Sequence, residues 1–161
     1  MYILTPVCLL LCGAVWACAD VCAFCDLQVI GQQLVYETEE MMVLYNYRPI
    51  CHEHYLVCPK RHVVRFEDLT AGEMVGIHSV VQKVHAAVHA VFGHTDYVLL
   101  NKNGPNAGQS VPHVHFHYMA APGSLPVYFL RNYWRMLGAP LNGEEIHHRT
   151  ARVALWLREH K

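Results

Sequence analysis

Apolar and polar residues alternate over several short stretches of the chain, and this two-residue period is typical of β-strands. Residues 34–47, LVYETEEMMVLYNY, predict two strands joined by a charged turn. Residues 54–58 predict a third strand that ends at Pro59, residues 96–100 a fourth and residues 112–119 a fifth.

The hydrophobic period changes to that of a helix after the third predicted strand. Residues 70–92 carry an apolar residue every three or four positions, which predicts one long helix. Thr70 and Glu73 have the spacing of a capping box, in which each side chain bonds the backbone N–H of the other. The tail predicts two further helices, near residues 127–137 and 143–159.

These elements together predict an α+β fold in which one main helix packs across an antiparallel sheet. The 161 residues suffice for one domain with a core, and 53% of them are hydrophobic against 16% charged. We therefore expect residues 20–161 to form a single domain, with a helical tail that begins near residue 124.

Residues 1–19 contain no charged side chain and stand apart from this pattern. Pro6 and Gly13 interrupt a stretch already short for a membrane span, so we expect no stable membrane anchoring. The Ala17-Cys18-Ala19 ending suits cleavage of a signal peptide, but the basic start of one is missing. An export signal and a start codon assigned too far upstream both stay open. We expect a cytoplasmic protein, or an exported one if this segment is cleaved.

The charge balance limits the classes of partner. The formal net charge is −1, which argues against a strongly basic nucleic-acid-binding protein. The unusual feature is the content of 13 histidines, side chains that titrate near neutral pH.

Three of these histidines, His113, His115 and His117, alternate with apolar residues in the last predicted strand. Alternate side chains of a strand share one face, so the three imidazoles should lie together. The preceding loop, residues 101–110, is rich in glycine and can bring backbone N–H groups close to an anion. This arrangement suits chemistry on a phosphoryl group, and a metal ion bound by the three histidines is the alternative.

The seven cysteines do not suit a disulfide framework, because their number is odd and most lie near the N-terminus. The spacing of Cys22 and Cys25 indicates half of a metal site or a redox pair.

Three stretches of the sequence resemble the histidine triad (HIT) family. HVHFHYM matches the histidine triad motif, and GPNAGQSVPHVHFH matches the loop that leads into it. VLYNYRPICHEHYLVCPKRHVVRFEDL resembles the corresponding region of the branch that hydrolyses diadenosine polyphosphates, which includes the fragile histidine triad proteins. The resemblance covers roughly residues 20–120 and implies a sheet of about five antiparallel strands.

The resemblance implies a nucleotide hydrolase that acts at the α-phosphate of phosphoanhydrides or phosphoramidates. His115 would attack phosphorus and form a covalent nucleotidyl-histidine, a two-step route that neutral imidazole supports. His113 and His117 would hydrogen-bond the phosphate, and His54 would orient the ring of His115. The implied nucleotide contacts are Asn46, Asn103, Gln109 and Ser110, and Ser110 also belongs to the implied catalytic residues. Relatives that transfer nucleotides have glutamine at the position of His117, so this histidine favours hydrolysis.

The resemblance also implies a structural zinc ion, because many bacterial members carry matching ligands. The ligands would be Cys22, Cys25, His62 and His113. Two buried thiols beside a solvent-facing histidine are the alternative. A divalent cation that accompanies the nucleotide stays open, and family members commonly form homodimers.

Departures from the family pattern concern the leaving group. Lys102 stands where the fragile histidine triad branch has glutamine, and Glu53 replaces a usual glycine. Besides hydrolysis, a nucleotide-binding sensor or scaffold with incidental turnover stays open, as does a hydrolase that uses a metal bound by the triad.

Overall fold

The computed structural model describes residues 22–121, 123, 130 and 138–160. The extension 1–19 and nearly all of the helix predicted near 127–137 lie outside these residues. Among the described helices, none is both long enough and apolar enough for a membrane span.

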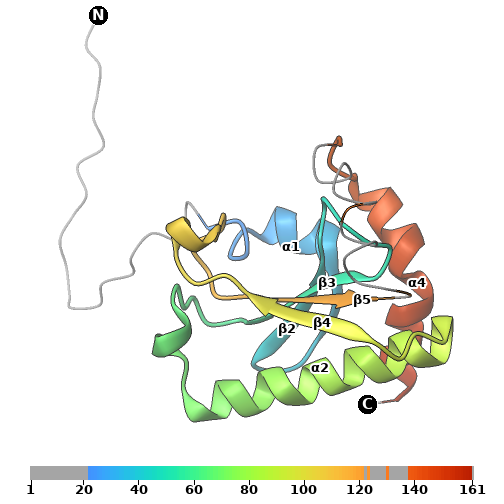
Figure 1. Cartoon of the computed structure of the whole chain (residues 1–161), viewed down its shortest axis with the longest axis horizontal. Coiled ribbons are helices and arrows are strands. Elements are labelled where there is room, and N and C mark those ends of the chain that lie inside the picture. The colour runs from blue at the N-terminus through green and yellow to red at the C-terminus, as the bar shows by residue number, and fades with distance from the viewer. Residues whose placement is uncertain (1–21, 122, 124–129, 131–137, 161) are drawn as a thin grey trace, which may run out of the picture.

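Five antiparallel strands form one sheet in the order β1-β2-β3-β5-β4 (Figure 1). They are β1 (Leu34–Glu37), β2 (Met41–Tyr45), β3 (His54–Pro59), β4 (Tyr97–Asn101) and β5 (Phe116–Ala120). The predicted α+β class and the number of strands are confirmed. β4 lies at one edge of the sheet, and β5 lies inside it between β3 and β4.

Three α-helices with described bounds accompany the sheet, namely α1 (Leu27–Gln33), α2 (Ala71–Phe92) and α4 (Gly143–Glu159). The long helix and the last helix were both predicted. α1 was missed because its seven residues are too few to establish a helical period. Short 3-10 turns at Phe66–Asp68 and Pro105–Ala107 complete the described elements.

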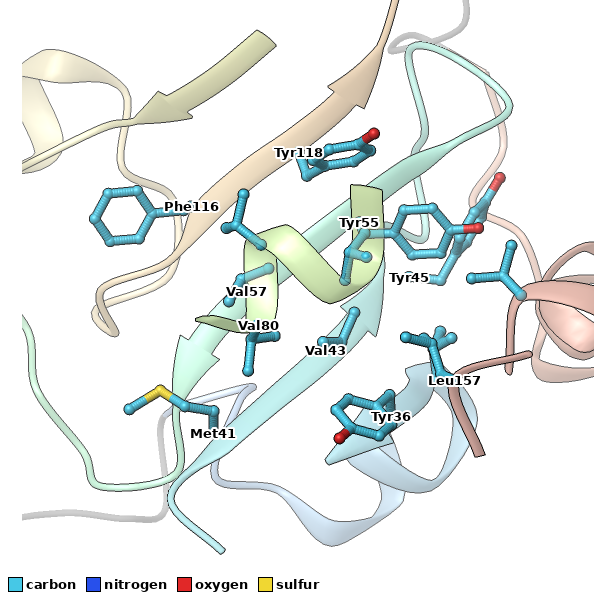
Figure 2. Close-up of a cluster of buried hydrophobic side chains, with 14 of the residues drawn as sticks. Tyr36, Met41, Val43, Tyr45, Tyr55, Val57, Val80, Phe116, Tyr118 and Leu157 are labelled. Carbon is cyan, nitrogen blue, oxygen red and sulfur yellow. The ribbon is translucent and has the colours of Figure 1, made fainter. Parts of the chain in front are cut away.

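The alternation of side chains gives the sheet two different faces. One face packs its apolar residues against α2 and α4 and forms the main core (Figure 2). Its sheet residues include Val43, Tyr45, Tyr55, Val57, Phe116 and Tyr118. The other face carries Met42, Leu44, Leu56 and Cys58, which pack with Cys22 and Phe24 of the N-terminal segment. His54 lies two residues before Leu56 on β3, and His117 pairs with Leu56 from β5. Both histidines therefore lie on this second face, away from the long helices.

The last strand is shorter than predicted, because it begins at Phe116 rather than at residue 112. The backbone N–H of Val114 donates to the carbonyl of Val63, 2.6 Å away, instead of joining the ladder with β3. His113 and His115 therefore lie in an irregular segment just before the strand, and only His117 belongs to it.

The predicted capping box at the start of α2 is present and includes an additional arginine. The Thr70 hydroxyl accepts from the Glu73 N–H, and the Glu73 carboxylate accepts from the Thr70 N–H. Arg61 donates to both carboxylate oxygens, at 2.8 and 2.7 Å. The Arg61 hydrogen bonds lower the pKa of Glu73 from 4.5 to about 2, and those from Thr70 act in the same direction.

Replacing Glu73 by glutamine should therefore lower the free energy of unfolding at pH 7 by about 1 to 2 kcal/mol. Because the folded state depresses the pKa of Glu73, this contribution is complete above pH 4.5 and is lost as the pH falls towards 2. Urea unfolding of the parent and of Glu73→Gln from pH 7 to pH 3 measures the difference. The exposed Glu39 provides the control substitution Glu39→Gln. A difference that stays constant with pH would contradict the ionic contribution.

Candidate functional site

His115 is held by a hydrogen bond to the backbone two residues before it. Its Nδ1 lies 2.7 Å from the carbonyl oxygen of His113. A carbonyl only accepts, so Nδ1 carries the proton and the lone pair of the neutral ring lies on Nε2. Nε2 has no partner among the described residues, yet it is not one of their fully buried, unsatisfied atoms. Phe24 packs edge-on against the ring, with centroids 5.1 Å apart.

A second chain of hydrogen bonds fixes His117. The N–H of Ile50 donates to Nδ1 of His54 at 3.2 Å, so the proton of His54 lies on Nε2. That proton is donated to Nδ1 of His117 at 2.9 Å, which leaves the His117 proton on Nε2. His54 was predicted to orient His115. The structure instead places it against His117, because His54 pairs with Met119 across β3 and β5.

Burial keeps these rings uncharged at neutral pH. It is the largest cause that lowers the pKa of His54 and of His117 to about 3, and their neighbouring imidazoles and Lys102 add to the effect. Burial also lowers the pKa of His115, although the His113 carbonyl opposes this by favouring the charged ring. Neutral His115 with an unprotonated Nε2 is a nucleophile, and neutral His117 can donate a hydrogen bond.

A pocket of about 310 Å³ opens beside His54 and His117. Its lining consists of Asn46, Tyr47, Arg48, Ile50, His54, Leu100, Lys102, Ser110, His117 and Met119. The pocket thus contains two of the predicted nucleotide contacts, Asn46 and Ser110. The Asn46 oxygen accepts from the N–H of Arg48 at 2.9 Å, and its amide nitrogen lies 3.2 Å from Nε2 of His54.

The other two predicted nucleotide contacts stabilise the loop instead of lining this pocket. Asn103 accepts from the Phe66 N–H and donates to Glu67. Gln109 accepts from the Gly104 N–H at 2.6 Å and donates to the Val64 carbonyl at 2.9 Å. In both residues, the oxygen and the nitrogen of the side-chain amide are therefore hydrogen-bonded to protein groups.

Asn101 has a positioning role that the sequence did not reveal. Its side chain donates to the carbonyl oxygen of His115 at 2.9 Å and so holds the backbone of that residue from β4. The predicted fourth strand ended one residue earlier, and a polar residue at the junction of strand and glycine loop was the available signal.

The four predicted metal ligands come together on the other side of His115. The donor atoms of Cys22, Cys25, His62 and His113 all lie within 4.8 Å of one another. Nδ1 of His113 is 3.5 Å from Sγ of Cys22 and 3.7 Å from Sγ of Cys25. Nε2 of His113 is 2.9 Å from the Pro59 carbonyl, so it carries the proton and leaves the Nδ1 lone pair towards the sulfurs.

This geometry assigns different tasks to the three triad histidines. His113 is fully buried and has protein partners at both ring nitrogens, so neither nitrogen is left for the predicted phosphate contact. The alternative of one metal ion bound by all three triad histidines does not fit, because both ring nitrogens of His113 already have protein partners. Within the described residues, the Cys/His group is the only cluster of this kind.

Comparison with known proteins identifies the family. The model of the HIT domain matches residues 28–122, which is more than half of the chain. A bifunctional bis(5'-adenosyl)-triphosphatase/adenylylsulfatase of Arabidopsis thaliana is 37% identical over 101 residues, 63% of this chain and 56% of that protein. An asymmetrical bis(5'-nucleosyl)-tetraphosphatase of Schizosaccharomyces pombe is 38% identical over 88 residues, 55% of this chain and 48% of that protein. The chain thus spans about half the length of these two relatives.

Solved structures have the same fold. The NitFhit protein of C. elegans superposes with a TM-score of 0.54 at 31% identity, over 66% of this chain and 27% of that one. The diadenosine triphosphate hydrolase of Plasmodium falciparum gives a TM-score of 0.65 at 18% identity, over 80% of this chain and 78% of that one. With the family model matched across the sheet, α2 and the triad motif, the chain belongs to the histidine triad family.

Proposed function

We propose that this protein hydrolyses dinucleoside polyphosphates or related nucleotide anhydrides at the α-phosphate, through a nucleotide bound covalently to His115. The observation that carries this proposal is the hydrogen bond from Nδ1 of His115 to the His113 carbonyl. It leaves Nε2 as the free, nucleophilic nitrogen of the ring. The triphosphatase and tetraphosphatase activities in the names of the relatives support the same reaction class.

In the first step, Nε2 of His115 attacks the α-phosphorus, and the bond from phosphorus to the leaving oxygen breaks. The leaving group keeps the electron pair, while the imidazole gains positive charge. The His113 carbonyl, 2.7 Å from Nδ1, stabilises that charge. His117 lines the pocket, and we propose that its Nε2–H donates to an oxygen at the reacting phosphorus.

In the second step, water attacks the same phosphorus and breaks the P–N bond. The products are a nucleoside monophosphate and free His115, and the water proton leaves with solvent. None of the described residues that line the pocket has a carboxylate, so a divalent cation that accompanies the nucleotide would be bound by the phosphates themselves.

Replacing His115 by asparagine should lower the hydrolysis of diadenosine triphosphate by at least about 10³-fold, because the nucleophile is lost. Rapid quench followed by mass spectrometry of the parent should find AMP attached to His115. His78→Asn, on the exposed side of α2, is the control and should keep full activity. Equal turnover by His115→Asn and the parent would contradict the proposal. Tight AMP binding without turnover by the parent would favour a nucleotide sensor.

We further propose that the Cys/His cluster binds one structural zinc ion. Zinc lies about 2.3 Å from sulfur and about 2.0 Å from nitrogen, so a tetrahedral site places these ligands about 3.6 Å apart. The observed S···N distances of 3.4, 3.5 and 3.7 Å fit this arrangement. Bound zinc would fasten the 22–25 turn to His113, and through the His113 carbonyl it would fix His115.

Purified protein should therefore contain about one zinc per chain by elemental mass spectrometry. Cys22→Ser should lose it, because four-ligand sites depend on each thiolate. His115→Asn should keep it, and Cys58→Ala controls for the loss of a buried thiol outside the cluster. Zinc retained by Cys22→Ser, or absent from parent protein supplied with the metal, would rule out this site.

We also propose a homodimer that forms along β4. This strand is one of the two edges of the sheet, where backbone N–H and C=O groups lack a neighbouring strand. Its Tyr97, Leu99 and Leu100 side chains are exposed, which is unusual for large apolar residues of a strand.

A charged side chain at this edge should separate the two copies. Leu99→Lys is expected to sediment as a monomer at concentrations at which the parent is a dimer. Leu155→Lys alters an exposed leucine of α4 and is the matched control. A parent that sediments as a monomer throughout the micromolar range would contradict the proposal.

A further inference from the structure

Lys102 lies in the same pocket as the triad residue His117, but the mechanism above gives it no role. It follows the last residue of β4 and lines the same pocket as His54 and His117. Its side chain lies along the glycine loop, where a Cβ on Gly108 would be 3.7 Å from Nζ. Gly108 has a φ of +84°, a backbone conformation that favours glycine over residues with a side chain. The ammonium therefore lies between the loop and the triad.

The charge of Lys102 has no partner in the part of the chain that the structure describes. Among the described residues, no ion pair joins Nζ to a carboxylate. The described residues that line the pocket include a second cation, Arg48, and no acid. Lys102 is also close enough that its positive charge helps to lower the pKa of His54 and of His117. A half-buried cation of this kind is complementary to an anion that enters the pocket.

The chemistry of bond cleavage decides which anion gains most from this charge. When the bond from the α-phosphorus to an oxygen leaving group breaks, negative charge accumulates on the leaving oxygen. A fixed cation stabilises that charge in the transition state. When the leaving group is an amine, as in a phosphoramidate, the nitrogen must instead take up a proton. The nitrogen takes this proton from solvent and carries a positive charge until the P–N bond breaks and the neutral amine leaves. The ammonium of Lys102 opposes that charge.

On this basis we propose that Lys102 is a specificity residue that selects substrates with an oxyanion leaving group over phosphoramidates. This inference rests on the proposed hydrolysis at His115 and specifies the substrate class of that site. The leaving oxyanion can be a nucleoside polyphosphate or a smaller group such as sulfate, because the cation recognises the charge that both share. Arg48 lies on the Tyr47 side of the pocket, with its guanidinium carbon 5.7 Å from the ring centre, so it is a different contact.

The test compares kcat/KM for diadenosine triphosphate, adenylyl sulfate and adenosine phosphoramidate. Lys102→Met keeps the length of the side chain and removes its charge. It should lower kcat/KM for the first two substrates by roughly 10- to 100-fold, the effect of losing one charge-assisted contact. Turnover of the phosphoramidate should not fall, and it should rise by less than about 3-fold, because the opposing charge is removed. Lys102→Arg should restore the parent's preference, and Lys83→Met on α2 is the control.

The outcomes separate this inference from the function on which it rests. An equal loss for all three substrates, or no change for any, would overturn the role of Lys102 and leave the hydrolase intact. A parent that cleaves none of the substrates and forms no adduct on His115 would overturn both. A drop for diadenosine triphosphate alone, with adenylyl sulfate unaffected, would overturn the selection by charge and indicate contacts with the longer phosphate chain.

Discussion

The hydrogen bond between Nδ1 of His115 and the carbonyl of His113 is the interaction on which the site depends. It fixes the position of the proton on the His115 ring and thereby the position of the lone pair. The carbonyl can do this only because His113 is itself immobile. Its Nε2 bonds to the Pro59 carbonyl at the end of β3, and its Nδ1 faces two cysteine sulfurs. A backbone dipole, held from both sides, thus orients the reactive ring.

A second constraint is the burial of neutral imidazoles around this centre. His54, His113 and His115 are almost completely buried, and an uncompensated charge there would be costly. Each ring nitrogen that carries a proton in this network meets an acceptor or faces the pocket, so the rings can remain neutral without unsatisfied donors. Lys102 adds a positive charge close to these rings. The centre therefore favours a neutral nucleophile and an anionic substrate at the same time.

Much of this could be predicted from the sequence because the relevant signals are local. The capping box of Thr70 and Glu73 depends on a spacing of three residues. The face of the sheet on which His117 lies depends on the two-residue period of a strand. The Cys/His cluster was predicted from family motifs rather than from spacing alone.

Where a contact depends on the pairing of distant strands, the prediction from the sequence was wrong. His54 was expected behind His115 and lies against His117, because nothing in the sequence states that His54 pairs with Met119. The start of β5 was misplaced for a similar reason, since Val114 bonds to Val63 from a distant loop.

The most direct test of this account is the tautomer of His115 at pH 7. Long-range ¹H–¹⁵N correlation spectra report which ring nitrogen carries the proton, and the signal is assigned by its loss in His115→Asn. The structure predicts a neutral ring with the proton on Nδ1 and an unprotonated Nε2. A proton on Nε2, or a ring protonated at both nitrogens, would contradict the claim that the His113 carbonyl prepares His115 as a nucleophile.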